Sequence, residues 1–363
     1  MRHTLVVCAI ACAMALVTQS FSQVRNAASN GGPAMPLTTF TVSPTKEKKP
    51  LTVTIVGTNP FSATPSGSVI DAVVVPMIFN IGGTVFDPTT PNSCDSNVSA
   101  LNRFNWSPMV QPVVSLTFNG VNVGTAQYVD DFMRAEFWNA TGGNPAYTNS
   151  INWSTAAPVT ITTGSSGITS GTGCSMVGVV SQALLDSQIS SLLQSLTQSG
   201  VISPAKFVLF LTTDVVGSSG NSPAPPGTSR CCNYGYHRFT GNPPQFYAFA
   251  DYAQGGPNEL AIVSHEVAEF MNDPLVNNPT PHWGGIGEIS GCSGLLEVGD
   301  PLVGMKAWMP ITMNGFTYHP QTVALLPWFE FQGNSSAIHN AYSYPNESAL
   351  TALSAPQPLN CGQ

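Results

Sequence analysis

The pattern of apolar positions predicts strands and helices in an irregular order. Residues 70–81 (IDAVVVPMIFNI) form a nearly continuous, β-branched apolar run, which is typical of a strand buried on both faces. Residues 206–216 (KFVLFLTTDVV) predict another buried strand, and residues 246–252 a short one. Residues 113–123 predict a hairpin, because an Asn-Gly turn lies between two apolar runs.

Residues 125–139 (TAQYVDDFMRAEFWN) have apolar side chains near helical spacing, with Asp130 and Arg134 four residues apart on the outer face. Asp130, Asp131 and Glu136 would then belong to a solvated face with an ion pair, an interpretation that we favour over a set of catalytic carboxylates.

Two further segments predict helices. Residues 182–196 repeat Leu and Ile at helical spacing. A third helix is expected to begin near Asn258, a plausible N-cap, and to stop at Asp273, which precedes a proline. Its apolar stripe comprises Leu260, Val263, Val267 and Phe270 or Met271.

Mixed strands and helices favour an α+β fold, with a mixed sheet packed with helices and a loop-rich C-terminal part. Strand candidates there lie near residues 306–318 and 324–331. Residues 23–65 are expected to be an irregular lead-in, and residues 66–363 a single globular domain. The Gly/Ser/Thr-rich residues 164–173 read as a linker and mark a possible subdivision.

The first residues predict export. Residues 5–17 are apolar, about 13 residues where a membrane span needs about 20, so residues 1–22 read as a signal peptide cleaved after Ser22. Cys8 and Cys12 lie inside the apolar run, which disfavours a lipoprotein. We expect a secreted protein, extracellular or periplasmic, with no integral membrane association once the signal is removed.

Charge is unusually sparse. Asp, Glu, Lys and Arg make up 8% of the chain, where about 25% is ordinary for a soluble domain, and the formal net charge is −8. Without a broad basic patch the chain lacks the electrostatic footprint of a nucleic-acid binder, so we expect no nucleic-acid partner.

Six cysteines remain after the predicted cleavage, and in an oxidising compartment they allow up to three disulfides. The adjacent Cys231 and Cys232 are expected to bond to different partners, because a ring between neighbours is strained. The six are Cys94, Cys174, Cys231, Cys232, Cys292 and Cys361.

The candidate chemistry lies in the segment SHEVAEFMNDP. His265 and Glu269 are four residues apart, so both project from one face of the helix and can grip one ion. In the zinc-peptidase pattern His-Glu-x-x-His, the intervening glutamate takes a proton from metal-bound water, and here Glu266 has that position. A glutamate replaces the second histidine. Zn²⁺ is the expected ion, although carboxylate-rich ligation also suits Ca²⁺ or Mn²⁺.

A catalytic zinc site usually takes three protein ligands, so more donors are needed. We favour Glu297 or Asp300, from LLEVGDP, and then His237, from CCNYGYHRF. His282 is a further candidate. His319 and His339 are expected to be surface or core-edge histidines.

These motifs, in this order, resemble the plant EXORDIUM (phosphate-induced protein 1) family and a related group of uncharacterised exported bacterial proteins. The resemblance rests on Gly-Tyr-His, the His-Glu-x-x-Glu helix ending in Asp-Pro, Trp283 and the Glu-x-x-Asp segment, within about residues 230–305. The strand VVVPMIFNI and the helix AQYVDDFMRAEFW extend it loosely to the bacterial group. Pro301 departs from the plant pattern, which has a cysteine shortly after the aspartate.

The resemblance implies a zincin-like metal helix and an extracellular or cell-wall setting. The site residues that it carries over are His237, His265, Glu266, Glu269, Glu297 and Asp300.

Two functions fit these observations. One is a secreted metal-dependent hydrolase, peptidase-like, in which His265, Glu269 and a downstream acid hold the metal and Glu266 activates water. The other is a non-catalytic extracellular protein with a structural metal site that binds a cell-wall polymer. Aromatic residues of the C-terminal third would suit glycan stacking, although buried packing is the expected role of Trp308, Tyr318, Trp328 and Tyr342. A serine hydrolase is not supported, because no Gly-x-Ser-x-Gly elbow occurs.

Overall fold

The computed structural model describes residues 34–45, 49–118, 120–256, 259–305, 308–351 and 353. The predicted signal peptide lies outside these residues. No helix among the described residues has both the length and the apolar character that a bilayer span requires.

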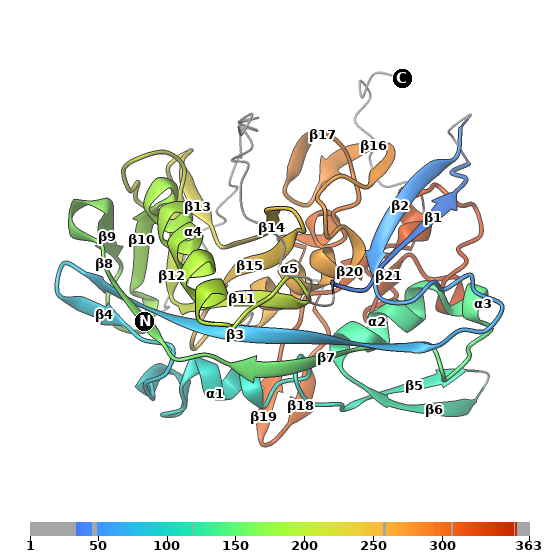
Figure 1. The fold of residues 1–363 in the computed structure, drawn as a ribbon, viewed down its shortest axis with the longest axis horizontal. Coiled ribbons are helices and arrows are strands. Elements are labelled where there is room, and N and C mark those ends of the chain that lie inside the picture. The colour runs from blue at the N-terminus through green and yellow to red at the C-terminus, as the bar shows by residue number, and fades with distance from the viewer. Residues whose placement is uncertain are drawn as a thin grey trace, which may run out of the picture.

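The strand predicted at residues 70–81 is β3 (Gly67–Ile81), and it organises the main sheet. Figure 1 shows it running along much of the molecule. One edge of β3 pairs in parallel with β7 (Thr148–Thr155) and then β8 (Val159–Thr162). The strands that follow β3 on the other side are β11 (Lys206–Thr213), β15 (Gln245–Tyr252) and the antiparallel edge strand β14 (Gly235–Thr240); β4 (Thr84–Phe86) folds back on the end of β3.

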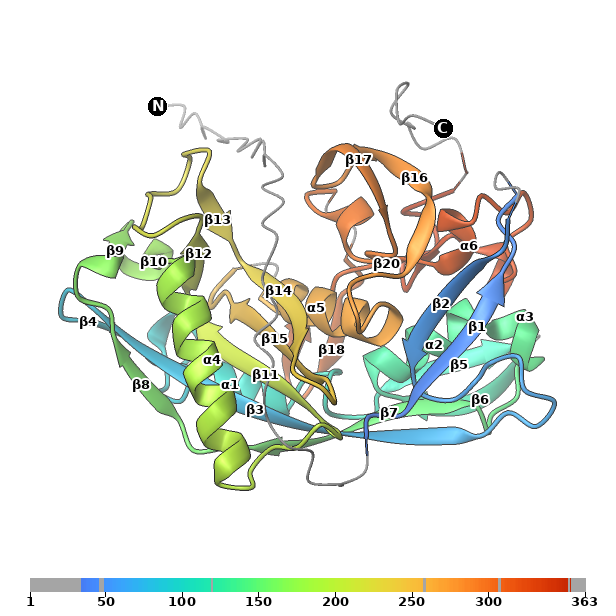
Figure 2. The same cartoon turned by 45° about the horizontal axis from the view of Figure 1, so that its top comes forward.

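Both faces of this sheet are buried, as its apolar strands predicted. Side chains alternate between faces along a strand, so Leu209 packs with α5 (Ala261–Asn272) while its neighbour Phe210 packs with α4 (Gln182–Gln198). Figure 2 shows α4 in front of the sheet. The two helices therefore cover opposite faces, and the predicted α+β class with a mixed sheet is confirmed.

Two segments that were expected to be irregular are ordered. Within residues 23–65, β1 (Leu37–Val42) and β2 (Leu51–Val56) form an antiparallel hairpin, so the prediction of an irregular lead-in is wrong there. Val53 and Ile55 are fully buried, because their alternate positions face the core. The predicted linker at residues 164–173 contains β9 (Gly167–Ser170), an edge strand of a second sheet.

That second sheet has the order β13 (Cys231–Asn233), β12 (Val215–Ser218), β10 (Val177–Ser181), β9. The apolar run at residues 206–216 is consequently two strands rather than one. Asp214 interrupts it with a positive φ of 54°, which turns the chain from β11 into β12.

The helix predicted at residues 125–139 is α2 (Tyr128–Glu136), followed by α3 (Trp138–Thr141). Its outer face is not solvated: every residue of α2 is buried. The predicted pair of Asp130 and Arg134 does form, with Oδ2 and Nη2 3.2 Å apart, but inside the protein. The prediction of a solvated face is wrong because the hairpins and the C-terminal segments cover this helix.

The remaining elements are short. The hairpin predicted at residues 113–123 is confirmed, whereas the strand candidate at residues 324–331 is mostly α6, a helical turn with a proline in its first turn. These elements are α1 (Ala100–Asn105), β5 (Val114–Phe118), β6 (Val121–Ala126), β16 (Pro279–Ile286), β17 (Ile289–Leu295), β18 (Ile311–Met313), β19 (Phe316–Tyr318), β20 (Val323–Ala324), α6 (Leu326–Phe329), β21 (Ser343–Tyr344) and the 3-10 helices Ser93–Asp95, Gly164–Ser166, Gly173–Ser175, Asp300–Leu302 and Ile338–Asn340.

Disulfides are present, as expected, but the pairing of the adjacent cysteines was predicted wrongly. Cys231 and Cys232 bond to each other across a cis peptide, with their Cα atoms 3.0 Å apart. Cys94 bonds to Cys174. Cys292 is disulfide-bonded as well.

Burial of α2 changes the acidity of its carboxyl groups. Burial raises the pKa of Asp131 to about 7, although the hydroxyl of Tyr344 donates a hydrogen bond to Oδ2 at 2.6 Å and opposes the shift. Between pH ~4 and pH ~7 the folded protein then holds a proton that the unfolded chain has lost. Stability contributed by this proton is lost as the pH rises through that window.

Replacing Asp131 with Asn removes this titration and keeps an acceptor for Tyr344. The wild-type free energy of unfolding should fall from about pH 4 to about pH 7, by at most ~1.4 kcal/mol per unit from this group. Chemical denaturation should show a smaller fall for Asp131→Asn than for the wild type. The exposed Asp71→Asn is the control; equal falls in all three proteins would contradict the assignment.

Candidate metal centre

The predicted metal helix exists as α5, and its polar face is buried. It begins at Ala261, with Leu260 in the N-cap position; Asn258, the predicted cap, lies outside the described residues. It ends before Asp273, as predicted. The apolar stripe packs into the core, where the ring of Phe270 stacks on the ring of Phe207 in β11, with centroids 4.0 Å apart.

Four donor side chains meet around one carboxylate oxygen, Oε2 of Glu269. It lies 3.1 Å from Nε2 of His265, one turn back on α5, and 3.4 Å from Nδ1 of His237, on β14. Nε2 of His265 is 3.4 Å from Oδ1 of Asp300, and Nδ1 of His237 is 3.7 Å from Oε2 of Glu266. Helix, edge strand and the segment after β17 thus converge, and all these side chains are buried.

The donors form two groups that share Glu269. One comprises His265, Glu269 and Asp300, the other His237, Glu266 and Glu269, and within each group the donor atoms all lie within 4.8 Å of one another. Each group therefore offers an ion two or more oxygens and one imidazole nitrogen.

Hydrogen bonds outside the cluster determine which imidazole nitrogens face it. Nε2 of His237 is 3.1 Å from the backbone oxygen of Asp273, which accepts a hydrogen bond from it. Nδ1 of His265 is 3.2 Å from Oε1 of Gln321, whose amide nitrogen donates in turn to the oxygen of Gly299 at 2.6 Å. Each ring thus carries its proton on the outer nitrogen and turns the other nitrogen toward the cluster, the arrangement common among metal-binding histidines.

A bare nitrogen facing a carboxylate is two acceptors in contact, which requires either a second proton on the ring or a cation between the atoms. The separations of 3.1–3.7 Å exceed the ~2.7–2.9 Å of charge-assisted hydrogen bonds. Two ligands ~2.1 Å from one zinc ion at the tetrahedral angle are about 3.4 Å apart. The donor spacing therefore fits ligands around an ion.

The buried histidines and carboxyl groups of this cluster shift one another's pKa values. Burial by itself would lower the pKa of both histidines. Glu266 and Glu269, together with Glu297 for His237 and Asp300 for His265, raise it well above its usual value. Burial would raise the pKa of Glu269, and the two histidines outweigh it and lower that pKa. The pKa of Glu266 is raised, because burial outweighs the same histidines.

Two more acids surround the group. Glu297 lies near Glu269 and His237, and its buried Oε2 has no hydrogen-bond partner. Burial, and then the nearby carboxylates of Glu269 and Asp300, raise its pKa well above the usual value. The sequence did not single out Glu288. Burial, and then the carboxylate of Asp300, raise the pKa of Glu288 to about 8. Five carboxyl groups therefore meet two imidazoles.

The predicted ligands are brought together, with one distinction. Asp300 rather than Glu297 stands in a donor group. His282 is exposed and belongs to neither group. The two histidines that were not expected to bind a metal are paired elsewhere, His319 with Glu259 and His339 with Glu347.

Sequence reasoning missed the residues that shape the cluster. Gln321 orients His265, and its backbone N–H is held by the hydroxyl of Ser264 at 2.8 Å. Two glycines leave room for the donors: a Cβ on Gly235 would lie 2.4 Å from Oε1 of Glu266, and one on Gly299 would lie 2.4 Å from Nδ1 of His265. The signal was present in both cases, because Gly235 is two residues before His237 on one strand face and Gly299 precedes Asp300.

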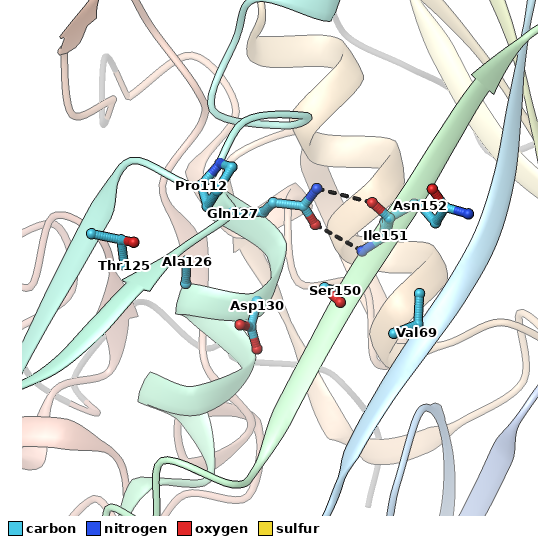
Figure 3. Close-up of a pocket in the computed structure, with 9 residues that line it drawn as sticks. All are labelled: Val69, Pro112, Thr125, Ala126, Gln127, Asp130, Ser150, Ile151 and Asn152. Atoms are coloured by element: carbon cyan, nitrogen blue, oxygen red, sulfur yellow. Dashed lines mark hydrogen bonds between the residues drawn. The ribbon is translucent and has the colours of Figure 1, made fainter.

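Figure 3 shows a separate pocket, between the start of α2 and β7. The side chain of Gln127 spans it, accepting from the N–H of Ile151 at 2.7 Å and donating to its oxygen at 2.9 Å. Asp130 lines this pocket but is already bonded to Arg134 and to the N–H of Asn149. We assign it no chemistry.

No family model, curated protein or solved structure matches this chain. The resemblance to the EXORDIUM family remains a prediction from the motifs.

Adding a methyl group at Gly299 should displace His265 without straining the backbone, because Gly299 has the ordinary φ of −81°. We expect Gly299→Ala to fold but to bind Zn²⁺ about 10- to 100-fold more weakly, the usual cost of disturbing a ligand's orientation. Competition with a chromophoric chelator measures the affinity. Gly291→Ala is the matched control, since its Cβ meets open space. Wild-type affinity in Gly299→Ala would show that His265 does not bind the ion.

Proposed function

We propose that this protein is a secreted, divalent-metal-dependent hydrolase, and that His265, Glu269 and Asp300 hold the ion. The observation that carries the proposal is the pair of imidazoles that donate outward and turn their other nitrogens toward buried carboxylates at ligand spacing. A zincin-like character of the metal helix belongs to this proposal.

Zn²⁺ is the ion that the donor set favours. Ca²⁺ and Mg²⁺ prefer all-oxygen sites, whereas an imidazole with two carboxylates suits Zn²⁺ and also Mn²⁺. The unpartnered Oε2 of Glu297 and the excess of acids over imidazoles support a cation of charge +2 in this place.

When bound, the ion would polarise a substrate carbonyl and make its bound water more acidic. Glu266 is the base that we assign. It precedes Glu269 on α5, and burial raises its pKa, which makes its carboxylate a stronger base. Nδ1 of His237 faces both Glu266 and Glu269, and a second proton on this ring would stabilise their negative charge. Gly235 lets the edge strand approach the Glu266 carboxylate.

The substrate that we propose is a peptide or a cell-wall polymer. The disulfides Cys94–Cys174 and Cys231–Cys232 support an oxidising compartment, and therefore export.

The second candidate is a non-catalytic extracellular protein with a structural metal site. Its supporting observation is burial: the side chains of His265, Glu266 and Glu269 are 8%, 6% and 4% exposed. None of the cluster's donor residues lines the pocket at the start of α2 or a second pocket at the end of α2. Of the aromatic residues suggested for glycan stacking, Tyr318, Trp328 and Tyr342 are buried, and Trp308 is half-buried.

The ligand assignment predicts different metal contents for two variants. Protein purified with Zn²⁺ should carry about one ion per chain by mass spectrometry of the native protein. Asp300→Asn should lose most of it, because Asp300 is a ligand, while His237→Gln should retain it. The reverse result would assign the ion to His237, Glu266 and Glu269 instead.

The base assignment predicts that Glu266→Gln keeps the ion and loses hydrolysis by at least ~100-fold, the usual contribution of a general base. A mixed peptide library and a peptidoglycan digest, each assayed with and without chelator, provide the readout. Glu347→Gln is the matched control, because Glu347 is a partly exposed acid that pairs with His339 and not with the cluster. Metal-loaded wild type that cleaves neither substrate would contradict the hydrolase and support the structural site.

A further inference from the structure

One of the two donor groups holds no ion in the proposed function. That function assigns the ion to His265, Glu269 and Asp300, and the other group consists of His237, Glu266 and Glu269. Only Glu269 belongs to both. We call the group of His237, Glu266 and Glu269 the second donor group. Its side chains are buried, and they come from the edge strand β14 and from α5.

The ring of His237 points between two carboxylate oxygens rather than at one of them. Its Nδ1 lies 3.4 Å from Oε2 of Glu269 and 3.7 Å from Oε2 of Glu266. Both separations exceed a charge-assisted hydrogen bond, and both are close to the ~3.4 Å between two ligands of one zinc ion. An ion in front of Nδ1 would therefore reach both carboxylates.

The first ion does not satisfy this nitrogen. Nε2 of His237 donates to the backbone oxygen of Asp273, so Nδ1 is the acceptor that faces the two carboxylates. Two acceptors in contact require a second proton on the ring or a cation between the atoms. The ion assigned to His265 and Asp300 supplies neither at this position, and a second cation would.

Glu269 is placed to serve two ions with one oxygen. Its Oε1 accepts the N–H of Gly299 at 3.1 Å, so Oε2 is the oxygen turned toward both His265 and His237. A carboxylate oxygen has two lone pairs, and the ions of two-metal sites lie about 3.5–4 Å apart. Oε2 can therefore bridge the two groups.

A further oxygen without a partner lies near the second donor group. Oε2 of Glu297 is buried and has no hydrogen-bond partner. Glu297 interacts electrostatically with Glu269 and His237, and of the two cluster histidines His237 interacts with it more strongly. Buried polar atoms are nearly always satisfied, so this oxygen is an independent indication of a missing cation beside His237.

The second ion should bind more weakly than the first. Two divalent cations that share one oxygen repel each other, so filling the first group makes the second harder to fill. An imidazole with carboxylates suits Zn²⁺ or Mn²⁺ rather than Ca²⁺ or Mg²⁺, which prefer all-oxygen sites. Protein purified without excess metal should accordingly hold the first ion alone.

We propose that the second donor group binds a second divalent cation, bridged to the first by Oε2 of Glu269, and that this cation inhibits hydrolysis. The inhibition rests on the proposed function, in which Glu266 is the base. A carboxylate that coordinates the second ion cannot accept a proton from the water on the first. The same three residues would thus make activity depend on the concentration of free metal.

Counting the bound ions tests the site directly. Chelator-stripped protein is dialysed against a series of free Zn²⁺ concentrations, and the bound zinc is measured by mass spectrometry. We expect two ions, the second with a dissociation constant at least tenfold higher. His237→Gln should lose the second ion and keep the first. His282→Gln is the matched control, because His282 is an exposed histidine outside both donor groups, and it should still bind two ions.

A spectroscopic readout on the wild type does not depend on the folding of a variant. Two Mn²⁺ ions joined by one oxygen couple their electron spins, whereas an ion bound at a distant surface histidine does not couple. The electron paramagnetic resonance spectrum should be that of isolated Mn²⁺ at low occupancy. It should become that of a coupled pair when the second ion binds.

Hydrolysis provides the third readout. Activity should rise as the first zinc ion binds and fall at least tenfold as the second binds, along the binding curve of the second ion. Residual hydrolysis by His237→Gln should not fall over the same range of zinc concentration.

The outcomes separate this proposal from the proposed function. A wild type that binds one ion only, or a second ion that is uncoupled and is lost in His282→Gln but not in His237→Gln, would overturn the second site and leave the hydrolase standing. Two coupled ions with undiminished hydrolysis would overturn the inhibition. Two coupled ions without hydrolysis at any zinc concentration would contradict the hydrolase, and the inhibition with it, while supporting the second site.

Discussion

The contact between the inward imidazole nitrogens and buried carboxylate oxygens is the constraint around which this region is built. Both histidines are held from outside, His237 by a backbone oxygen and His265 by Gln321, so neither can turn its protonated nitrogen inward without losing that bond. In a low-dielectric interior, unpaired acceptors are costly, and several carboxyl groups surround these two rings. A divalent cation, as proposed, would resolve the conflict with one species.

The rest of the fold serves to bring the donors to this point. The edge strand β14 carries His237 across from α5, and the segment after β17 brings Asp300 to the other side. Gly299 links the two halves, because its N–H donates to Oε1 of Glu269 at 3.1 Å while its oxygen accepts from Gln321. The hydroxyl of Tyr128 on α2 donates to the backbone oxygen of Gln321, so α2 supports the same residue. Burial of α2 is thus connected to the site.

How much of this could be predicted from the sequence depends on the distance along the chain. The pairing of His265 with Glu269 follows from the helical repeat and is confirmed. The choice of Asp300 over Glu297 could not be predicted, because it depends on the path of the chain around Gly299. Gln321, 56 residues from His265, carries no local signal of its role. The spacing of Asp130 and Arg134 is the same in a solvated helix and in a covered one, so the sequence could not predict that the pair is buried. By contrast, polar and apolar residues alternate in LTVTIV, the sequence of β2, and this local pattern is sufficient to predict a strand.

The most direct measurement of the central claim is the position of the ion itself. A crystal structure of the zinc-loaded protein, with anomalous data collected on both sides of the zinc edge, locates the metal without reference to activity. The account predicts one peak within about 2.0–2.2 Å of Nε2 of His265, Oε2 of Glu269 and Oδ1 of Asp300. A fully zinc-exposed crystal with no peak among these atoms, and with both imidazoles bonded directly to the carboxylates, would contradict it.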